Sequence, residues 1–160
     1  CGLRRAPVLY RDDRPGMSAM TPEAIVAKLG MQPHPEGGHY VELWRDPPPE
    51  GGRGRASLIH FLLRAGEVSH WHAVDAPEIW IWQAGAPLEL SIAETGQAGE
   101  VLRLGPDLMA GDRFQGVVPE GHWQAARSLG DWTLVSCVVA PAFRFEGFTL
   151  APPDWRPELG

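Results

Sequence analysis

Two imidazoles and a carboxylate are the side chains of this sequence best suited to chemistry. His70 and His72 are one residue apart, and Glu78 follows six positions after the second histidine. Side chains alternate between the two faces of a β-strand, so we expect His70 and His72 to point the same way. Two imidazoles and a carboxylate from neighbouring strands are typical ligands of a divalent first-row metal. This segment therefore predicts a metal site with His70, His72 and Glu78 as ligands.

A second segment, His122-Trp123-Gln124, could complete that site. It follows the turn-forming residues Pro119 and Gly121, and we expect His122 and Gln124 on one face of the next strand. An imidazole is the better metal ligand, and a carboxamide oxygen is a weaker one. Either His122 or Gln124 is therefore a further candidate ligand, and the predicted cofactor is a divalent ion of Mn, Fe, Ni or Zn.

Two tryptophans share the predicted strand face of Glu78. Trp80 and Trp82 follow it at intervals of two residues, so if Glu78 points into the interior, both tryptophans should point there too. A carboxylate beside two indoles suits a flat or partly apolar ligand. Trp80, Trp82 and Gln124 are therefore candidate ligand-binding residues, although tryptophans on this face would equally fill a hydrophobic core.

A stretch rich in glycine and proline before the first long strand contains further polar side chains. His34 and Glu36 either line the mouth of a cavity and bind a ligand, or belong to a turn fixed by the neighbouring prolines and glycines. Tyr40 follows on the strand, where a phenol could act as a general acid. The candidate catalytic residues are therefore His72, Tyr40 and Glu78.

Short strands separated by glycines and prolines must position these residues. The 160 residues are enough for one domain with a single core. Thr21 and Pro22 have the residue types of a helix start, and Gly30 can end that helix. The pattern after Gly30 is typical of a β-sandwich or β-barrel. The predicted strands are 38–45, 56–64, 68–74, 78–84, 88–94, 100–104, 113–118, 122–128 and 132–140, with a hairpin loop at 47–52 and a tight connection at 95–99.

The composition argues against several classes of function. The formal net charge is -6 and there is no run of lysines and arginines, which is evidence against a nucleic-acid partner. No apolar run reaches the ~18 residues of a membrane-spanning helix. The two cysteines give no disulfide framework, and Cys137 lies in an apolar run that favours a buried free thiol. We expect a cytoplasmic protein with a small-molecule ligand and no membrane partner.

The first residues differ from the rest of the chain. Residues 1–16 are rich in arginine and proline, and the sequence does not begin with methionine. Met17 or Met20 could be the natural start. We therefore expect residues 1–20 to be a poorly ordered N-terminal extension and residues 21–160 to form a single barrel domain.

Two motifs in the chain resemble those of the cupin superfamily. The segment 66–85, with the pattern Gly-(x3)-His-x-His-(x5)-Glu-(x6)-Gly, resembles the first cupin motif, and Pro119-x-Gly121-(x2)-Gln124 resembles the second. The spacing in the first motif differs from the usual one, and Gln124 occupies the place of the usual final histidine.

A closer resemblance, over about residues 21–155, is to the cupin-5 family (DUF985). It rests on the strings at 31–40, 57–63 and 118–126, and above all on His-Pro-Glu-Gly-Gly at 34–38. The resemblance implies an all-β cupin-type double-stranded β-helix, a jelly-roll barrel with a short N-terminal helix, and a homodimer. Members often carry Arg and Asp where this chain has Ala73 and Pro77, whereas His70 completes a His-x-His pair that many members lack.

Three functions fit these observations. The first is a metal-dependent cupin enzyme acting on a small polar molecule by isomerisation, epimerisation or oxygen-dependent cleavage. The second is a metal-free enzyme similar to nucleotide-sugar epimerase cupins, with His72 as general base. The third is a non-enzymatic barrel that binds or senses a small ligand.

Overall fold

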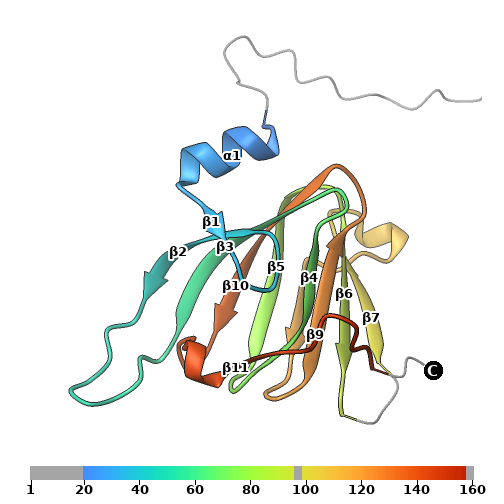
Figure 1. The fold of residues 1–160 in the computed structure, drawn as a ribbon. Coiled ribbons are helices and arrows are strands. Elements are labelled where there is room, and N and C mark those ends of the chain that lie inside the picture. Colours follow the sequence, from blue (N-terminus) through green and yellow to red (C-terminus); the bar gives the residue numbers. More distant parts are fainter. Residues whose placement is uncertain (1–19, 96–98, 158–160) are drawn as a thin grey trace, which may run out of the picture.

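The computed structural model describes residues 20–95 and 99–157, which form two antiparallel β-sheets packed face to face (Figure 1). The elements are α1 (Pro22–Leu29), β1 (Gln32–Pro33), β2 (His39–Arg45), β3 (Ser57–Arg64), β4 (Val68–Val74), β5 (Glu78–Gly85), β6 (Leu88–Ala93), β7 (Glu100–Leu104), η1 (Leu108–Ala110), β8 (Gln115–Val118), β9 (Trp123–Ser128), β10 (Trp132–Val139), η2 (Phe145–Gly147) and β11 (Phe148–Leu150). One sheet has the order β1-β2-β3-β10-β5-β8, and the other has the order β11-β4-β9-β6-β7. The prediction of a jelly-roll barrel with one short helix is confirmed.

Alternation along the strands explains how the barrel is filled. Phe61 and Leu63 of β3 face the interior, whereas Leu62 between them packs on the outside. A fully buried leucine contributes about 1.5–3 kcal/mol to stability, so the leucines of β6 and β7 stabilise their side of the barrel strongly. The interior core consists of Phe61, Leu63, Trp80, Leu88, Leu90, Ile92, Leu102, Leu104, Val118, Ala126, Val135 and Cys137.

The helix α1 forms as predicted and packs through Ile25, its one buried residue, on the outer side of the first sheet. The Thr21 hydroxyl accepts the backbone N–H of Ala24 at 3.1 Å, and Gly30 ends the helix with φ 64°. Ile25 then packs with Met31 against side chains of β3 and β10. Within the described ranges, no helix is long and apolar enough to cross a membrane.

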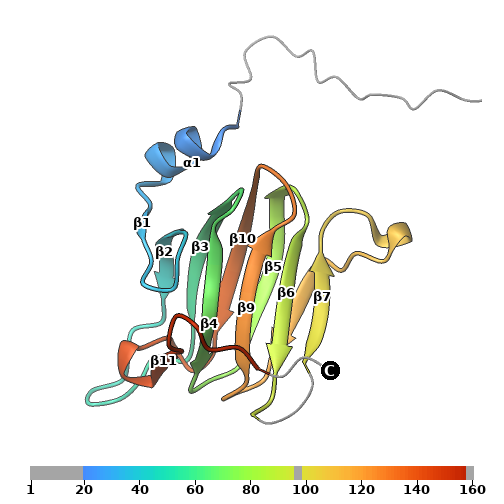
Figure 2. The ribbon, with the colours of Figure 1, turned by 45° about the vertical axis from the view of Figure 1, so that its right-hand side comes forward.

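The segment after β10 passes from one sheet to the other. We call residues 141–150 the strap; it contains η2 and ends in β11. β11 pairs with β4, from Phe148 opposite Val74 to Leu150 opposite His72. Figure 2 shows β11 beside β4 at the edge of the second sheet. The strap therefore closes one side of the barrel interior.

The nine predicted strands correspond to β2 through β10, with bounds that differ by at most two residues. The elements β1, η1, η2 and β11 were not predicted, because two or three residues are too few to show a periodicity. The predicted connection at 95–99 includes residues 96–98, and the predicted extension at 1–20 includes residues 1–19; both of these stretches lie outside the described residues.

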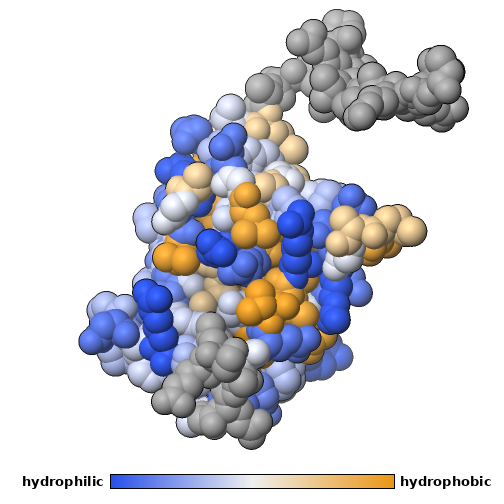
Figure 3. Space-filling view, turned by 90° about the vertical axis from the view of Figure 1, so that its right-hand side faces the viewer, coloured by the Kyte–Doolittle hydropathy of each residue, from blue (hydrophilic) through white to orange (hydrophobic). Residues whose placement is uncertain are grey.

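The side of the barrel formed by β7 and β8 retains apolar side chains in contact with solvent. These two strands are the last members of their sheets. Figure 3, which looks onto the side of β6 and β7, shows hydrophobic patches among hydrophilic residues. This side encloses the leucine-rich part of the core rather than the cavity. Its exposed apolar residues are Val101, Leu108, Met109, Phe114 and Val117.

Candidate functional site

A cavity of about 110 Å³ lies in the half of the barrel formed by β2, β3, β4, β5 and β10, beneath the strap. This volume holds several water molecules or a few non-hydrogen atoms of a ligand. The polar residues that line the cavity are His34, Glu36, Tyr40, Glu42, Arg45, Ser57, His72, Glu78, Cys137 and Arg144, and the apolar ones are Ile59, Phe61, Val74, Val139, Phe143, Phe145 and Phe148.

The loop before β2 brings Glu36 into the interior. The backbone N–H of His70 on β4 donates to the Glu36 carbonyl at 2.8 Å. Gly37 has φ 111°, and a Cβ at this position would overlap the backbone oxygen of Val68. Only glycine permits so close an approach of loop and strand. The Pro-Glu-Gly-Gly sequence therefore allows the loop to bury Glu36 against β4.

A β-bulge in β4 places His72 inside the barrel and His70 outside. Ser69 and His72 are three residues apart in β4. Their partners in β9, Ala126 and Gln124, are only two residues apart, so β4 contains one extra residue. The extra residue interrupts the alternation of side chains. Ser69 and His72 are both buried, whereas Nε2 of His70 lies 2.9 Å from the Pro152 carbonyl oxygen in an exposed contact. The prediction that His70 and His72 share a face is therefore wrong.

Glu36 and His72 meet in a contact that requires a proton. The Nδ1 of His72 lies 2.7 Å from the His70 carbonyl oxygen, which can only accept, so Nδ1 carries a hydrogen. In the neutral ring, Nε2 then has a lone pair, and it lies 3.2 Å from Oε2 of Glu36. The Glu36 backbone N–H donates to Nδ1 of His34 at 3.2 Å, and that nitrogen lies 3.5 Å from the same carboxyl oxygen. The Ser69 hydroxyl donates to the other oxygen, Oε1, at 2.9 Å. One proton, carried by Oε2 of Glu36 or by Nε2 of His72, satisfies this arrangement.

Burial favours the neutral form of each of these groups. Burial raises the pKa of Glu36 to about 8, and the hydrogen bond from Ser69 opposes this only in part. Burial also lowers the pKa of His72. The pKa of His34 is lowered to about 4, first by burial and then by the charge of His72. Near neutral pH, Glu36 therefore holds the proton and both imidazoles are neutral.

A second buried chain of hydrogen bonds holds Glu78. The Trp80 indole N–H donates to Oε1 of Gln124 at 2.7 Å, and Nε2 of Gln124 donates to Oε2 of Glu78 at 2.7 Å. Burial raises the pKa of Glu78 to about 7, against the opposing effects of His72 and Gln124. The Cys137 thiol contacts Glu78, and burial raises the pKa of this thiol. The cavity therefore contains a second carboxyl group that can be neutral near pH 7.

Aromatic rings of the strap cover these groups. The ring of Phe148 lies 5.5 Å from that of His72 and 5.9 Å from that of His34. On its other side, His34 packs edge-on against Tyr40 at 4.7 Å. Phe145 packs against Phe148 at 6.1 Å and continues the cover outward. These rings limit the access of water to the Glu36 carboxyl group, which strengthens the electrostatic interactions there.

The structure separates the predicted metal ligands. His70 faces outward, and Nδ1 of His122 lies 3.3 Å from the Glu120 carbonyl oxygen in the turn before β9. Gln124 is buried, but both ends of its carboxamide are committed to hydrogen bonds within the protein. Among residues 20–95 and 99–157, no three His, Cys, Asp or Glu side chains are arranged to hold a metal ion. The donor set predicted from the sequence therefore does not fit a divalent metal.

The remaining predicted site residues divide into two groups. Trp80 and Trp82 do not line the cavity, because Trp80 is buried in the core and the Trp82 indole N–H donates to the Ala86 carbonyl at 3.1 Å. The alternative interpretation, that these tryptophans fill the core, describes their positions. The predicted residues that do line the cavity are His34, Glu36, Tyr40, His72 and Glu78.

Several residues that contact the site were not singled out from the sequence. Ser69 reaches Glu36 only because of the bulge, for which the sequence carries no signal. Cys137 was expected to be buried, but its contact with Glu78 depends on the pairing of β10 with β5. The cover of the cavity is marked in the sequence by three phenylalanines, at 143, 145 and 148, which all lie within eight residues after the last predicted strand.

Comparison with known families identifies the protein at the level of its family. Residues 23–151 match Cupin_5, described as Cupin superfamily (DUF985). The chain belongs to the Cupin_5 family. This match confirms the resemblance seen in the motifs. A comparison of this Cupin_5 protein with curated proteins finds no match.

Solved structures agree with this assignment. A protein of Shewanella oneidensis is 35% identical with a TM-score of 0.79, over 83% of this chain and 85% of that chain. A hypothetical protein from Leishmania major is 28% identical with a TM-score of 0.75, over 82% and 88%. Oxalate decarboxylase from Bacillus subtilis is 12% identical with a TM-score of 0.58, over 74% of this chain and 29% of that chain. At that identity, the likeness concerns the fold alone.

Proposed function

We propose that this Cupin_5 protein binds a small polar molecule in the barrel cavity and moves a proton to or from it with Glu36 and His72, as an isomerase or epimerase does. The observation that supports the proposal best is the 3.2 Å contact between Oε2 of Glu36 and Nε2 of His72 in the cavity lining. General acid–base catalysis works best with a pKa near the operating pH. The pKa of about 8 at Glu36 meets this requirement.

The pair can exchange protons with a ligand while its own net charge stays the same. A ligand carbonyl oxygen that contacts Glu36 takes the proton from Oε2, and Nε2 of His72 takes a proton from the neighbouring C–H group. Glu36 is then a carboxylate beside an imidazolium. The His70 carbonyl holds the His72 tautomer and stabilises the imidazolium through the Nδ1 hydrogen bond. Tyr40 and Glu78 line the same cavity and are candidates to complete the proton path.

Exchange of solvent deuterium into a panel of keto sugars and 2-keto acids, followed by NMR, tests this proposal. A substrate should exchange the hydrogen next to its carbonyl group. Glu36→Gln and His72→Gln should each slow the exchange by at least about 100-fold. His70→Ala should leave the rate unchanged, because its ring lies outside the cavity. Exchange that persists in His72→Gln would contradict the proposed role of this histidine.

A non-enzymatic ligand-binding barrel is the second candidate. The observation that favours it is the strap, which pairs with β4 through β11 and covers the cavity with aromatic rings. Such a barrel should gain thermal stability from a metabolite that it does not convert. Turnover of any compound that binds would exclude this candidate.

A further inference from the structure

We infer that the mouth of the cavity is a subsite for an anionic group of the ligand, a carboxylate or a phosphate, and that Arg144 is the residue that binds it. This inference rests on the proposed function, because it concerns the same cavity. The ligand is then a small molecule with a neutral polar part inside the barrel and a negative charge at the mouth.

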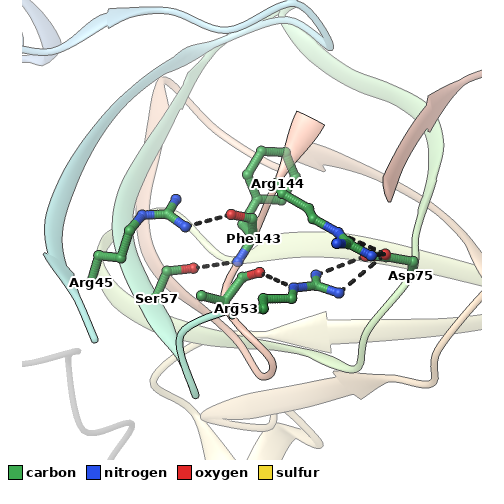
Figure 4. Close-up of polar contacts among 7 residues, drawn as sticks. Arg45, Arg53, Ser57, Asp75, Phe143 and Arg144 are labelled. Atoms are coloured by element: carbon green, nitrogen blue, oxygen red, sulfur yellow. Dashed lines mark hydrogen bonds and ion pairs between the residues drawn. The ribbon is translucent and has the colours of Figure 1, made fainter. Parts of the chain in front are cut away.

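The backbone of the strap is fixed at the cavity mouth by three hydrogen bonds (Figure 4). The Arg45 guanidinium donates to the Phe143 carbonyl at 2.6 Å, and the Phe143 N–H donates to the Ser57 hydroxyl at 2.9 Å. Arg53 donates to the Ala142 carbonyl at 2.6 Å. Arg144 directly follows Phe143. Its backbone is therefore fixed by these hydrogen bonds, and its side chain lines the cavity.

Three arginines and two carboxylates form the ion pairs that hold the strap, so the charges within this group do not cancel. Arg45 forms a bidentate pair with Glu42, with contacts of 2.7 and 3.0 Å. Arg53 forms a bidentate pair with Asp75, with contacts of 2.8 and 3.1 Å. Each of these pairs is neutral by itself. The third guanidinium, that of Arg144, carries the surplus positive charge.

Arg144 is the guanidinium best able to take a ligand. Within the described residues, its side chain donates hydrogen bonds only to Oδ2 of Asp75, at 3.1 and 3.3 Å, and this oxygen already accepts from Arg53. Those contacts use its Nε and Nη2, and within the described residues its Nη1 makes no hydrogen bond. The Arg144 side chain is 51% exposed, so an anion can reach it without the burial of an unpaired charge. A guanidinium binds both carboxylate and phosphate well.

The size of the cavity places the ligand's charge at the mouth. A space of about 110 Å³ holds only a few non-hydrogen atoms beside Glu36 and His72. That interior is covered by aromatic rings and contains carboxyl groups, which repel an anion when they are ionised. The neutral part of the ligand therefore suits the interior, and its anionic group suits Arg144. Sugar phosphates and keto acids have this form.

Titration of the ¹⁵N-labelled protein with inorganic phosphate, and separately with acetate, tests the subsite by NMR. We expect the amide signals of the strap to shift with the added anion. Arg144→Gln should weaken this binding about tenfold or more, and Arg144→Lys should weaken it less, because the charge remains. Arg127→Gln is the matched control: Arg127 is 57% exposed and pairs with Glu89 on another face, so the shifts should stay as in the native protein.

The phosphate and acetate titrations separate the two ligand chemistries, and tighter binding of either supports the subsite. Unchanged binding by Arg144→Gln, or an equal loss in Arg127→Gln, would overturn it. The result is independent of turnover, because Glu36→Gln should still bind the anion. Anion binding without any proton exchange in the native protein would count against the proposed function alone, and proton exchange without anion binding at Arg144 would count against the subsite alone.

Discussion

Replacement of Glu36 by glutamine should change how the stability of this protein depends on pH. The folded protein holds a proton on Glu36 up to about pH 8, whereas the unfolded chain releases it near 4.5. The stability that comes from this raised pKa is fully present below pH 4.5 and is lost as the pH rises to about 8. Glutamine has no proton to release, so Glu36→Gln should not show this loss.

The size of the effect follows from the two pKa values. Each pH unit between 4.5 and about 8 changes the free energy of unfolding by about 1.4 kcal/mol, which amounts to about 5 kcal/mol. At pH 4.5, the glutamine amide can still donate to Nε2 of His72 and accept from Ser69, so the two proteins should differ by only about 1 kcal/mol. By pH 8.5, Glu36→Gln should be the more stable protein by about 4–5 kcal/mol.

Urea denaturation followed by tryptophan fluorescence, at a series of pH values, measures this difference. His34, His72 and Glu78 are present in both proteins; the charge of Glu36 also raises the pKa of Glu78, but burial is the larger cause of that shift. Glu120→Gln, a change at an exposed position before β9, is the control and should differ from the native protein by a constant amount. The reasoning is refuted if the difference for Glu36→Gln changes by less than about 1 kcal/mol between pH 4.5 and 8.5.

Three further changes test how the site is built. Gly37→Ala should destabilise the fold by at least about 2 kcal/mol more than Gly66→Ala. Both residues have a positive φ, but of the two only Gly37 lacks space for a Cβ. Equal losses of stability in urea denaturation would contradict this. Asp75→Ala should lower the free energy of unfolding by about 1–2 kcal/mol, because the ion pairs with Arg53 and Arg144 are lost. It should also speed amide hydrogen exchange at η2. Unchanged exchange would show that Asp75 does not hold the strap. Trp80→Phe leaves Gln124 without its donor and should lower the free energy of unfolding by about 1–3 kcal/mol, and a neutral effect would mean that this hydrogen bond is dispensable.

The strands could be predicted because their signals are local. Alternating apolar residues and the glycines and prolines between them mark β2 through β10 in the sequence itself. The helix was equally visible, since Thr21 and Gly30 act as caps within their own segment. The strap was not visible as structure, because β11 has three residues and depends on β4 for its hydrogen bonds.

The site was only partly predictable, because its geometry depends on contacts between distant segments. His72 and Glu78 were found through their residue types and spacing. The expected partner His70 turns outward because β4 contains a bulge, which is a property of its register with β9. Glu36 was recognised as a candidate, but its contact with His72 requires the loop at Gly37 to pack on β4. Residue types could therefore suggest the participants but not the pairs that they form.

The proton at the Glu36–His72 contact can be observed most directly by ¹⁵N NMR of the His72 ring, assigned through the signals missing from His72→Gln. At pH 7 we predict a neutral ring with hydrogen on Nδ1 and a lone pair on Nε2, since the His70 carbonyl holds the Nδ1 hydrogen and Glu36 keeps its own proton. A doubly protonated ring, or a neutral ring with hydrogen on Nε2, would contradict the proposed arrangement of the site.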